Sequence, residues 1–340
     1  MDLYILDKSL TPIAVVDYYE SLIWTKRFYT SGDFEIYIPA SSEILNIMIQ
    51  GNYITRLDDD RVMMIEKIQV QTDVEIGNYL LCSGRSVEAL CKRRIVWKQT
   101  NINGYAETGI RRLVNENIIS PTIANRKIEN FILGKAKNFT EKIEIQITGD
   151  ILEETISNIC KSNGWGYKVT LNKNKKFVFE LYKGNESGVV FSPEYDNLIN
   201  SDYLNDMTTF ANCALIAGEG EGTARITETI GNASGVDRYE TFIDARDISS
   251  NNGEISKSEY KKLLLQRGEE KLKETQPLTS FEGEVAHDLT YVYKKDYDIG
   301  DVVNVVNEYG IKGTARIIEI IESDGTDGYK VIPTFDEWSV

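Results

Sequence analysis

The residue types that most often carry catalysis or bind metals are sparse in this sequence. It holds one histidine, His287, and four cysteines, Cys82, Cys91, Cys160 and Cys213, which show no CxxC spacing. A Ser-His-Asp triad would have to be built around His287, and no GxSxG motif is present. We therefore expect a structural histidine in a strand, reduced buried thiols, and no catalytic, metal or cofactor site.

The segment GEGEG (218–222) has the glycine content of a phosphate-binding loop. It lacks the Lys-Ser/Thr pair of a P-loop, and the strand-like run TARITETI follows it where a dinucleotide-binding fold would place a helix. Its two glutamates would also repel phosphate. The sequence therefore predicts a hairpin turn here.

Paired carboxylates could still form a glycosidase, which needs two acids roughly 5 to 10 Å apart. With 53 acidic residues some pair will always lie that close, and the densest polar cluster is Asp244, Arg246 and Asp247 in TFIDARDISS. An ion-paired loop at a subunit contact explains this cluster more simply. A carbohydrate-active or cell-wall-degrading enzyme remains the alternative function, and a receptor-binding module with an exposed aromatic patch is a third.

The elements that would position these residues are mostly strands. Short runs rich in Ile, Val, Tyr and Leu alternate with Asp, Gly and Asn over 1–104, which predicts a compact β-domain. One helix is expected at 42–50, with Ser41 or Ser42 as its cap and Gly51 as its stop. Helical spacing at 105–117 and 150–163, with Asp150 as cap and Gly164 as stop, and a hairpin from 166 to 182 predict an α+β module over 105–196.

Long strands return over 197–340, where a helix at 256–275 divides them. The order of β-domain, α+β insert and second β-domain suggests a duplicated barrel. The expected fold class is thus β-rich α+β, with two barrel-like domains, an inserted module, and a helix that splits the second barrel.

Charge and hydropathy exclude several function classes. The net charge is −15, which argues against general affinity for DNA or RNA, since binding a phosphate backbone requires clustered Lys and Arg. No apolar run approaches the roughly 18 to 20 residues that span a bilayer, and the N-terminus lacks the basic region of a signal peptide. We expect a protein made in a cytoplasm that does not insert into membranes.

Three segments together resemble the tail-hub proteins of siphoviruses, which have a baseplate-hub fold and occur in phages and prophages of Gram-positive bacteria. They are SLIWTKRFYTSGDFEIYIPAS (21–41), IAGEGEGTARITETIG with GVDRYETFIDARDIS (216–249), and DYDIGDVVNVVNEYGIKGTARIIEIIES (296–323). The three segments occur in the family's order and at its separations, so the resemblance covers nearly the whole chain.

The resemblance implies a structural role at the tail tip of a virion assembled in the bacterial host. A homotrimer with two tube-like β-barrels per subunit would form a pseudo-hexameric ring that matches the tail tube. The implied partners are a distal tail or tail tube protein above, the tape-measure protein, and a tip, fibre or lysin protein below. DNA would pass through the ring without specific binding.

The residues of the matching segments that we expect to fix turns or subunit contacts are polar, aromatic and glycine residues. They are Trp24, Gly32, Phe34, Asp237, Arg238, Asp244, Arg246, Gly300, Asp301 and Arg316. Their expected roles are structural.

Overall fold

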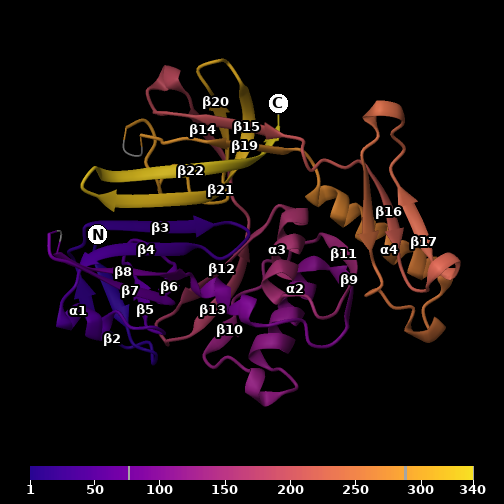
Figure 1. The fold of residues 1–340 in the computed structure, drawn as a ribbon, viewed down its shortest axis with the longest axis horizontal. Coiled ribbons are helices and arrows are strands. Elements are labelled where there is room, and N and C mark those ends of the chain that lie inside the picture. Colours follow the sequence, from indigo (N-terminus) through magenta and orange to yellow (C-terminus); the bar gives the residue numbers. More distant parts are fainter. Residues whose placement is uncertain (76, 287–288, 340) are drawn as a thin grey trace.

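The computed structural model describes residues 1–75, 77–286 and 289–339, and it has a β-rich α+β fold, as the sequence predicts (Figure 1). A ten-stranded sheet runs across the molecule. Eight of its strands form one path, in the spatial order β15 (Asp202–Asp206), β19 (Leu278–Glu282), β22 (Gly328–Ser339), β21 (Lys312–Gly325), β3 (Ser21–Arg27), β4 (Asp33–Pro39), β8 (Gly77–Arg85) and β7 (Lys67–Asp73). The remaining two, β14 (Glu186–Phe191) and β20 (Val302–Val306), pair with each other, and β20 pairs with β21.

The eight-strand path joins the two ends of the chain. Four of its strands come from the first 85 residues and four from beyond residue 200, and they meet where β3 pairs antiparallel with β21, with Thr25 opposite Ile321. Figure 1 shows this junction as indigo strands beside yellow ones. The two halves pair with each other side by side, and the end strands β15 and β7 do not pair with one another. In the described ranges no sheet closes, so the two closed barrels expected per chain are not found.

A second sheet covers the N-terminal half of the large one. Its strands are β2 (Pro12–Val16), β1 (Leu3–Leu6), β5 (Tyr53–Thr55) and β6 (Val62–Met64). Trp24, Phe34 and Met48 belong to the core between the sheets. Helix α1 (Ser42–Ile47) begins at its predicted cap, where the Ser41 side chain accepts from the Ile44 amide, but it ends before the predicted stop.

The α+β module has the expected elements. Strand β9 (Thr100–Tyr105) pairs with β11 (Lys142–Ile147), and β10 (Phe131–Leu133), β13 (Phe177–Tyr182) and β12 (Gly166–Leu171) form a second sheet. The β12–β13 hairpin is confirmed. Helix α2 (Ala106–Val114) continues into a π-helical turn, η2 (Asn115–Ile119).

Helix α3 (Leu152–Asn163) ends at Gly164 in the left-handed conformation, as predicted. Its start differs, because the cap is Ile151 and no side chain caps it, so Asp150 does not have the expected role. Residue Ile151 instead forms a β-bridge to Ile95, which fixes the entry to the helix by tertiary pairing.

The chain between β15 and β19 forms a separate lobe (Figure 1, right). It contains β16 (Cys213–Ala217), β17 (Thr227–Ile230), β18 (Glu240–Asp244) and helix α4 (Lys257–Glu274). The predicted helix is confirmed, and a capping box between Ser256 and Glu259 starts it. However, β16 to β18 make their own sheet, so the helix packs on a lobe and does not split a barrel.

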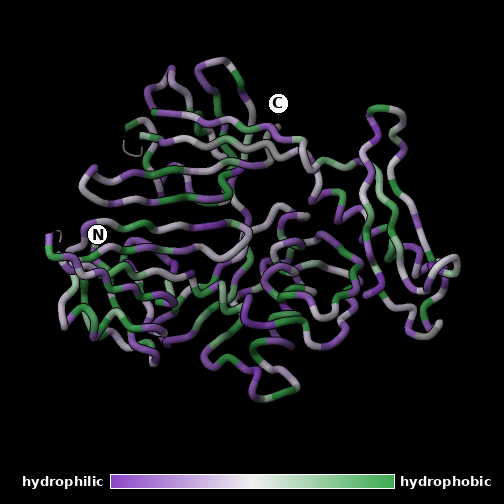
Figure 2. The backbone as a smooth tube through the Cα atoms, in the orientation of Figure 1, coloured by the Kyte–Doolittle hydropathy of each residue, from purple (hydrophilic) through white to green (hydrophobic). Residues whose placement is uncertain are grey.

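The GEGEG segment lies between the antiparallel strands β16 and β17, as predicted for a turn. Six short 3-10 helices complete the chain: η1 (Val87–Arg93), η3 (Ala124–Arg126), η4 (Pro193–Tyr195), η5 (Gly222–Ala224), η6 (Gly235–Asp237) and η7 (Asn251–Gly253). Figure 2 shows hydrophobic stretches in the N-terminal strands and in the strands of the lobe.

Candidate interface site

The lobe presents an open sheet face. One face of its three-stranded sheet packs on α4, where Ile216, Ile243 and Leu264 form a small core. On β16 and β18 the intervening residues Leu215 and Phe242 point the other way, because side chains alternate along a strand. These two are register partners, and they are 41% and 57% exposed. Their exposure leaves an apolar centre on a surface that none of the described residues covers.

Ion pairs surround this centre. Asp244 accepts from Arg225 and from Arg246, each at 2.6 Å, and the Arg225 guanidinium lies 5.7 Å from the centre of the Phe242 ring. The bond from Arg246 lowers the pKa of Asp244 to about 2. A general acid needs a raised pKa, so Asp244 is unsuited to the proton donation that a glycosidase requires.

The other two candidates on the lobe lie at the start of β18. Arg238 donates through Nε to Glu240 at 2.6 Å and through Nη1 to the Ala233 carbonyl at 2.9 Å. The carbonyl of Asp237 accepts from Asn212. We call the exposed Leu215 and Phe242 together with Arg225, Arg238, Asp244 and Arg246 the lobe face. An apolar centre with a charged rim is the usual anatomy of a protein interface.

Trp24, Gly32 and Phe34 lie elsewhere, around the β3–β4 hairpin. Trp24 and Phe34 are buried neighbours with ring centres 6.4 Å apart. Gly32 has no room for a side chain, since a Cβ there would lie 2.0 Å from the Thr25 carbonyl oxygen, and its amide donates to Ser86. These three residues shape the fold of the protomer.

Gly300, Asp301 and Arg316 come together at the start of β20. Gly300 has a φ of 93°, and its carbonyl accepts from Arg316 at 2.8 Å. Asp301 accepts from the Asn185 amide at 2.7 Å and from the Asp298 amide at 2.9 Å. This cluster therefore ties the strand β14, which lies within the predicted bounds of the α+β module, to the C-terminal strands.

A buried ionic cluster was missed from the sequence. Lys26 on β3 lies 3.4 Å from Asp59 and 3.2 Å from Asp298, and Arg56 pairs with Glu322 on β21 at 2.8 Å. Burial lowers the pKa of Lys26, but Asp59 and Asp298 outweigh that effect and hold it above its ordinary value. The only signal in the sequence was the acidic run 58–60 between two arginines.

A second buried pair extends this charge toward the α+β module. Arg61 pairs with Glu88, and its guanidinium also donates to the Tyr182 hydroxyl at 3.1 Å. Burial raises the pKa of Tyr182 to about 12. We call Lys26, Arg56, Asp59, Asp298 and Glu322 the buried ionic cluster. Apart from Asp298, whose side chain is 48% exposed, its side chains lie inside the protein, and the cluster joins the N-terminal strands to the C-terminal ones.

The four cysteines are buried and unpaired with one another, as expected. Over 1–75, 77–286 and 289–339, no group of three or more His, Cys, Asp or Glu residues could hold a metal ion. The expectation for His287 lies outside the described residues. No helix of the described chain is long and apolar enough to cross a membrane.

The model of one protein family, described as siphovirus ReqiPepy6 Gp37-like protein, matches residues 2–335. The chain belongs to this siphovirus family. The siphovirus resemblance of the three sequence segments is thereby confirmed. No curated protein sequence matched this Gp37-like chain.

Solved structures of phage tail proteins share the fold of this Gp37-like protein. The 43 kDa tail protein of prophage MuSo2 from Shewanella oneidensis has 14% identity and a TM-score of 0.62, covering 99% of this chain and 98% of that one. A tail protein from Neisseria meningitidis MC58 has 13% identity and a TM-score of 0.60, covering 99% and 96%. Prophage tail protein gp18 from Listeria monocytogenes EGD-e has 12% identity and a TM-score of 0.55, covering 100% and 96%.

Proposed function

We propose that this protein is a structural hub of a phage tail tip, in which three copies form a ring. The ring would join the tail tube to the distal tip proteins, and DNA would pass through its centre. The siphovirus family and the fold shared with phage tail proteins support a place in the tail. The observation that carries the ring is the eight-strand path, because it has two four-strand halves and two open edges.

The edges of the path suit addition of another copy. Strand β7 is exposed along nearly its whole length, and β15 is largely exposed as well. Unpaired edge strands of this length invite pairing with another chain, and natural proteins usually cover them. A head-to-tail contact from β7 of one copy to β15 of the next would generate a closed ring when the rotation closes.

The directions of the strands are compatible with such a closure. Every neighbouring pair along the path is antiparallel, so β7 and β15, separated by seven such steps, run in opposite directions. Under rotation about an axis roughly parallel to the strands, β15 of the next copy would add antiparallel to β7. Each copy would then contribute two similar halves, which is the basis of the pseudo-hexameric symmetry proposed for three subunits.

Charge supports the passage of DNA without specific binding. The net charge of −15 would be tripled in the ring, and phosphate backbones are repelled by such a field. The proposed partners are a distal tail or tail tube protein above, the tape-measure protein, and a tip, fibre or lysin protein below. The cell-wall-degrading alternative has no supporting observation at Asp244, whose pKa is lowered.

Single-particle imaging and mass photometry of the protein mixed with its neighbouring tail gene products test this proposal. We expect a threefold ring with a channel wide enough for duplex DNA. A protein that stays monomeric with every tail component and releases sugars from purified cell walls would instead support the enzyme alternative.

A further inference from the structure

A short stretch of the chain carries several cations, most of which have no carboxylate partner among the described residues. Residues 92–98 read KRRIVWK, and Lys92, Trp97 and Lys98 in this stretch are exposed. Arg126 from η3 packs on it, with its guanidinium 4.8 Å from the centre of the Trp97 ring. We call Lys92, Arg94, Trp97, Lys98 and Arg126 the basic patch.

Backbone hydrogen bonds hold the two arginines of the basic patch in place. Arg94 donates through Nε to the Arg126 carbonyl at 2.8 Å, and Arg126 donates through Nη2 to the Ile95 carbonyl at 2.7 Å. Burial, and then the charge of Arg93, lower the pKa of Arg94, while burial and then Arg94 lower that of Arg126. The guanidiniums of Arg94 and Arg126 are therefore held in place next to other positively charged groups.

The neighbouring arginines Arg85 and Arg93 share one carboxylate partner, whereas the cations of the basic patch have none among the described residues. Arg93 and Arg85 both pair with Glu66, at 2.9 Å and 2.7 Å. Within the described part of the chain, no carboxylate pairs with any of the four cations of the basic patch. The chain has 53 acidic and 38 basic residues, so the basic patch is opposite in sign to the net charge of the chain.

The basic patch also offers apolar contact. Trp97 is 53% exposed, Ile95 two residues before it is 38% exposed, and Ile123, which directly precedes η3, is 43% exposed. Arginine and tryptophan are the residue types that most often dominate binding energy at protein interfaces. A guanidinium binds a carboxylate through two parallel hydrogen bonds, and its pre-orientation lowers the entropy lost on binding.

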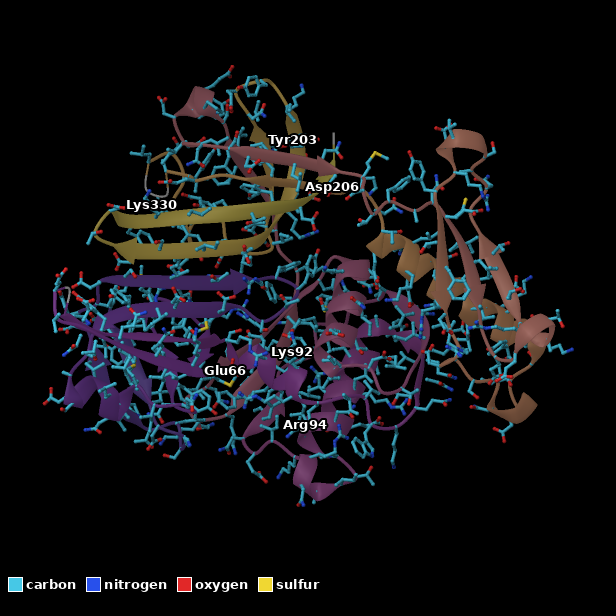
Figure 3. The ribbon with its side chains drawn as sticks, viewed as in Figure 1. Glu66, Lys92, Arg94, Tyr203, Asp206 and Lys330 are labelled. Carbon is cyan, nitrogen blue, oxygen red and sulfur yellow. The ribbon has the colours of Figure 1, made fainter. Side chains whose placement is uncertain are left out.

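We propose that the basic patch binds an acidic segment of another tail protein, through carboxylates at the cations and apolar side chains at Trp97. Nucleic acid is the competing polyanion, and the binding comparison below distinguishes the two occupants. The contacts proposed between copies use β7 and β15. Figure 3 shows Lys92 and Arg94 on the opposite side of the molecule from Tyr203 and Asp206 of β15, whereas Glu66, which precedes β7 and pairs with Arg93, lies close to Lys92. The identity of the partner rests on the proposed tail function; the chemistry of the basic patch does not.

Zero-length carbodiimide coupling on assembled tails tests the proposal directly, because it joins a lysine amine to a carboxylate only when the two are in contact. We expect Lys92 or Lys98 to be coupled to Asp or Glu of a different tail protein. Coupling to another copy of this chain, or no coupling at either lysine in tails that contain the chain, would overturn the inference and leave the tail function standing. Absence of the chain from purified tails would instead count against the tail function.

Binding by charge-reversed variants of the full chain gives a second readout. Lys92→Glu with Lys98→Glu removes two exposed cations that pair with no carboxylate of the described chain, so the fold should be retained. We expect this variant to bind labelled poly-L-glutamate about tenfold more weakly than the parent, a loss of about 1.4 kcal/mol. The matched control, Lys173→Glu with Lys257→Glu, has the same net charge and should bind within about twofold of the parent. Equal loss in both variants, or preference of the parent for duplex DNA over poly-L-glutamate, would refute the proposal.

Discussion

Lys26 and Asp59 form an ion pair that is shielded from water on every side. Their Nζ and Oδ2 atoms are 3.4 Å apart, and the side chains are 4% and 0% exposed. Lys26 lies on β3 and Asp59 in the loop before β6, while Asp298, which also contacts Lys26, comes from the C-terminal region. The pair therefore lies where the two halves of the large sheet meet.

Removing one partner of this pair should be costly. Lys26→Ala removes one of the two lysines that lie 3.4 Å from the buried Asp59 carboxylate, and Lys294 remains as the other. Breaking a buried pair typically costs about 3 to 5 kcal/mol, so with Lys294 still in place we expect a loss at the low end of that range. Urea unfolding of the variant should show that loss in the free energy of unfolding. Arg238→Ala, which breaks the exposed pair with Glu240, is the control and should cost under about 1 kcal/mol. If Lys26→Ala and Arg238→Ala lower the free energy of unfolding by similar amounts, burial does not strengthen the Lys26–Asp59 ion pair.

Acid should destabilise the protein through the same cluster. Burial raises the pKa of Asp59, but Lys26 and Lys294 outweigh it, so the pKa is lowered from its ordinary value of 3.8. Because the folded-state pKa lies below the unfolded one, the contribution is complete above about pH 4 to 5 and is lost as the pH falls further. Unfolding free energies measured from pH 7 to pH 3 should fall at the acid end. Asp59→Asn should have a lower free energy of unfolding at pH 7, and this free energy should fall less steeply toward pH 3. An unchanged slope in the variant would show that Asp59 does not contribute to the acid destabilisation.

The β3–β4 hairpin should not tolerate a side chain at residue 32. A Cβ at Gly32 would meet the backbone oxygen of Thr25 at 2.0 Å, and backbone cannot move aside as a flexible side chain can. We expect Gly32→Ala to lower the free energy of unfolding by more than about 2 kcal/mol. Gly188→Ala, where no atom lies within 4 Å of the added Cβ, is the matched control and should cost under about 1 kcal/mol. Equal thermal stability of the two variants would show that the hairpin can rearrange.

Charge reversal on the lobe face should impair assembly more than folding. Arg246 is 66% exposed and pairs only with its neighbour Asp244 among the described residues, so Arg246→Glu should change the free energy of unfolding by under about 1 kcal/mol. If the lobe face contacts a neighbouring subunit, Arg246→Glu and Arg238→Glu should reduce the fraction of trimer in mass photometry with tail partners. Lys173→Glu, on the distant β12–β13 turn, is the control. If the variants lose folding and assembly to the same extent, the lobe face is not a subunit interface.

The register between β7 and β15 of adjacent copies can be predicted from charge. Placing Asp206 opposite Lys67 puts Asp202 opposite Gln71, whereas a shift of two residues toward the end of β7 would put Asp202 opposite Asp73, and facing like charges destabilise a sheet. The double variant Lys67→Cys with Asp206→Cys should therefore form a disulfide-linked trimer in assembled tails, since antiparallel partners lie within bonding range. Gln69→Cys with Asp206→Cys is the control. Preferential cross-linking in the control would assign the shifted register.

Local signals in the sequence identified the elements whose determinants are close together in the chain. The β12–β13 hairpin, the start of α1 at Ser41 and the end of α3 at Gly164 each depend on a few neighbouring residues, and all were predicted. The same holds for α4, whose start depends on Ser256 and on Glu259 three residues later.

Features that depend on distant partners could not be predicted. The pairing of Thr25 with Ile321 joins residues almost 300 positions apart, and no local pattern encodes it. The strands of the lobe show the same alternation as those of the large sheet, so their separation into another sheet left no sequence signal. Lys26 lies in the first of the three matching segments, but its burial depends on Asp59 and Asp298 meeting it in space.

The lobe leaves and re-enters the large sheet at two residues that face each other. Asp206, the last residue of β15, is the register partner of Leu278, the first residue of β19. Opposed residues of an antiparallel pair are close enough for a tight turn to connect them. Loss of the lobe, or its replacement by another segment through recombination, would therefore leave the strand order of the large sheet unchanged. In evolution the lobe can for this reason change independently of the sheet that carries it.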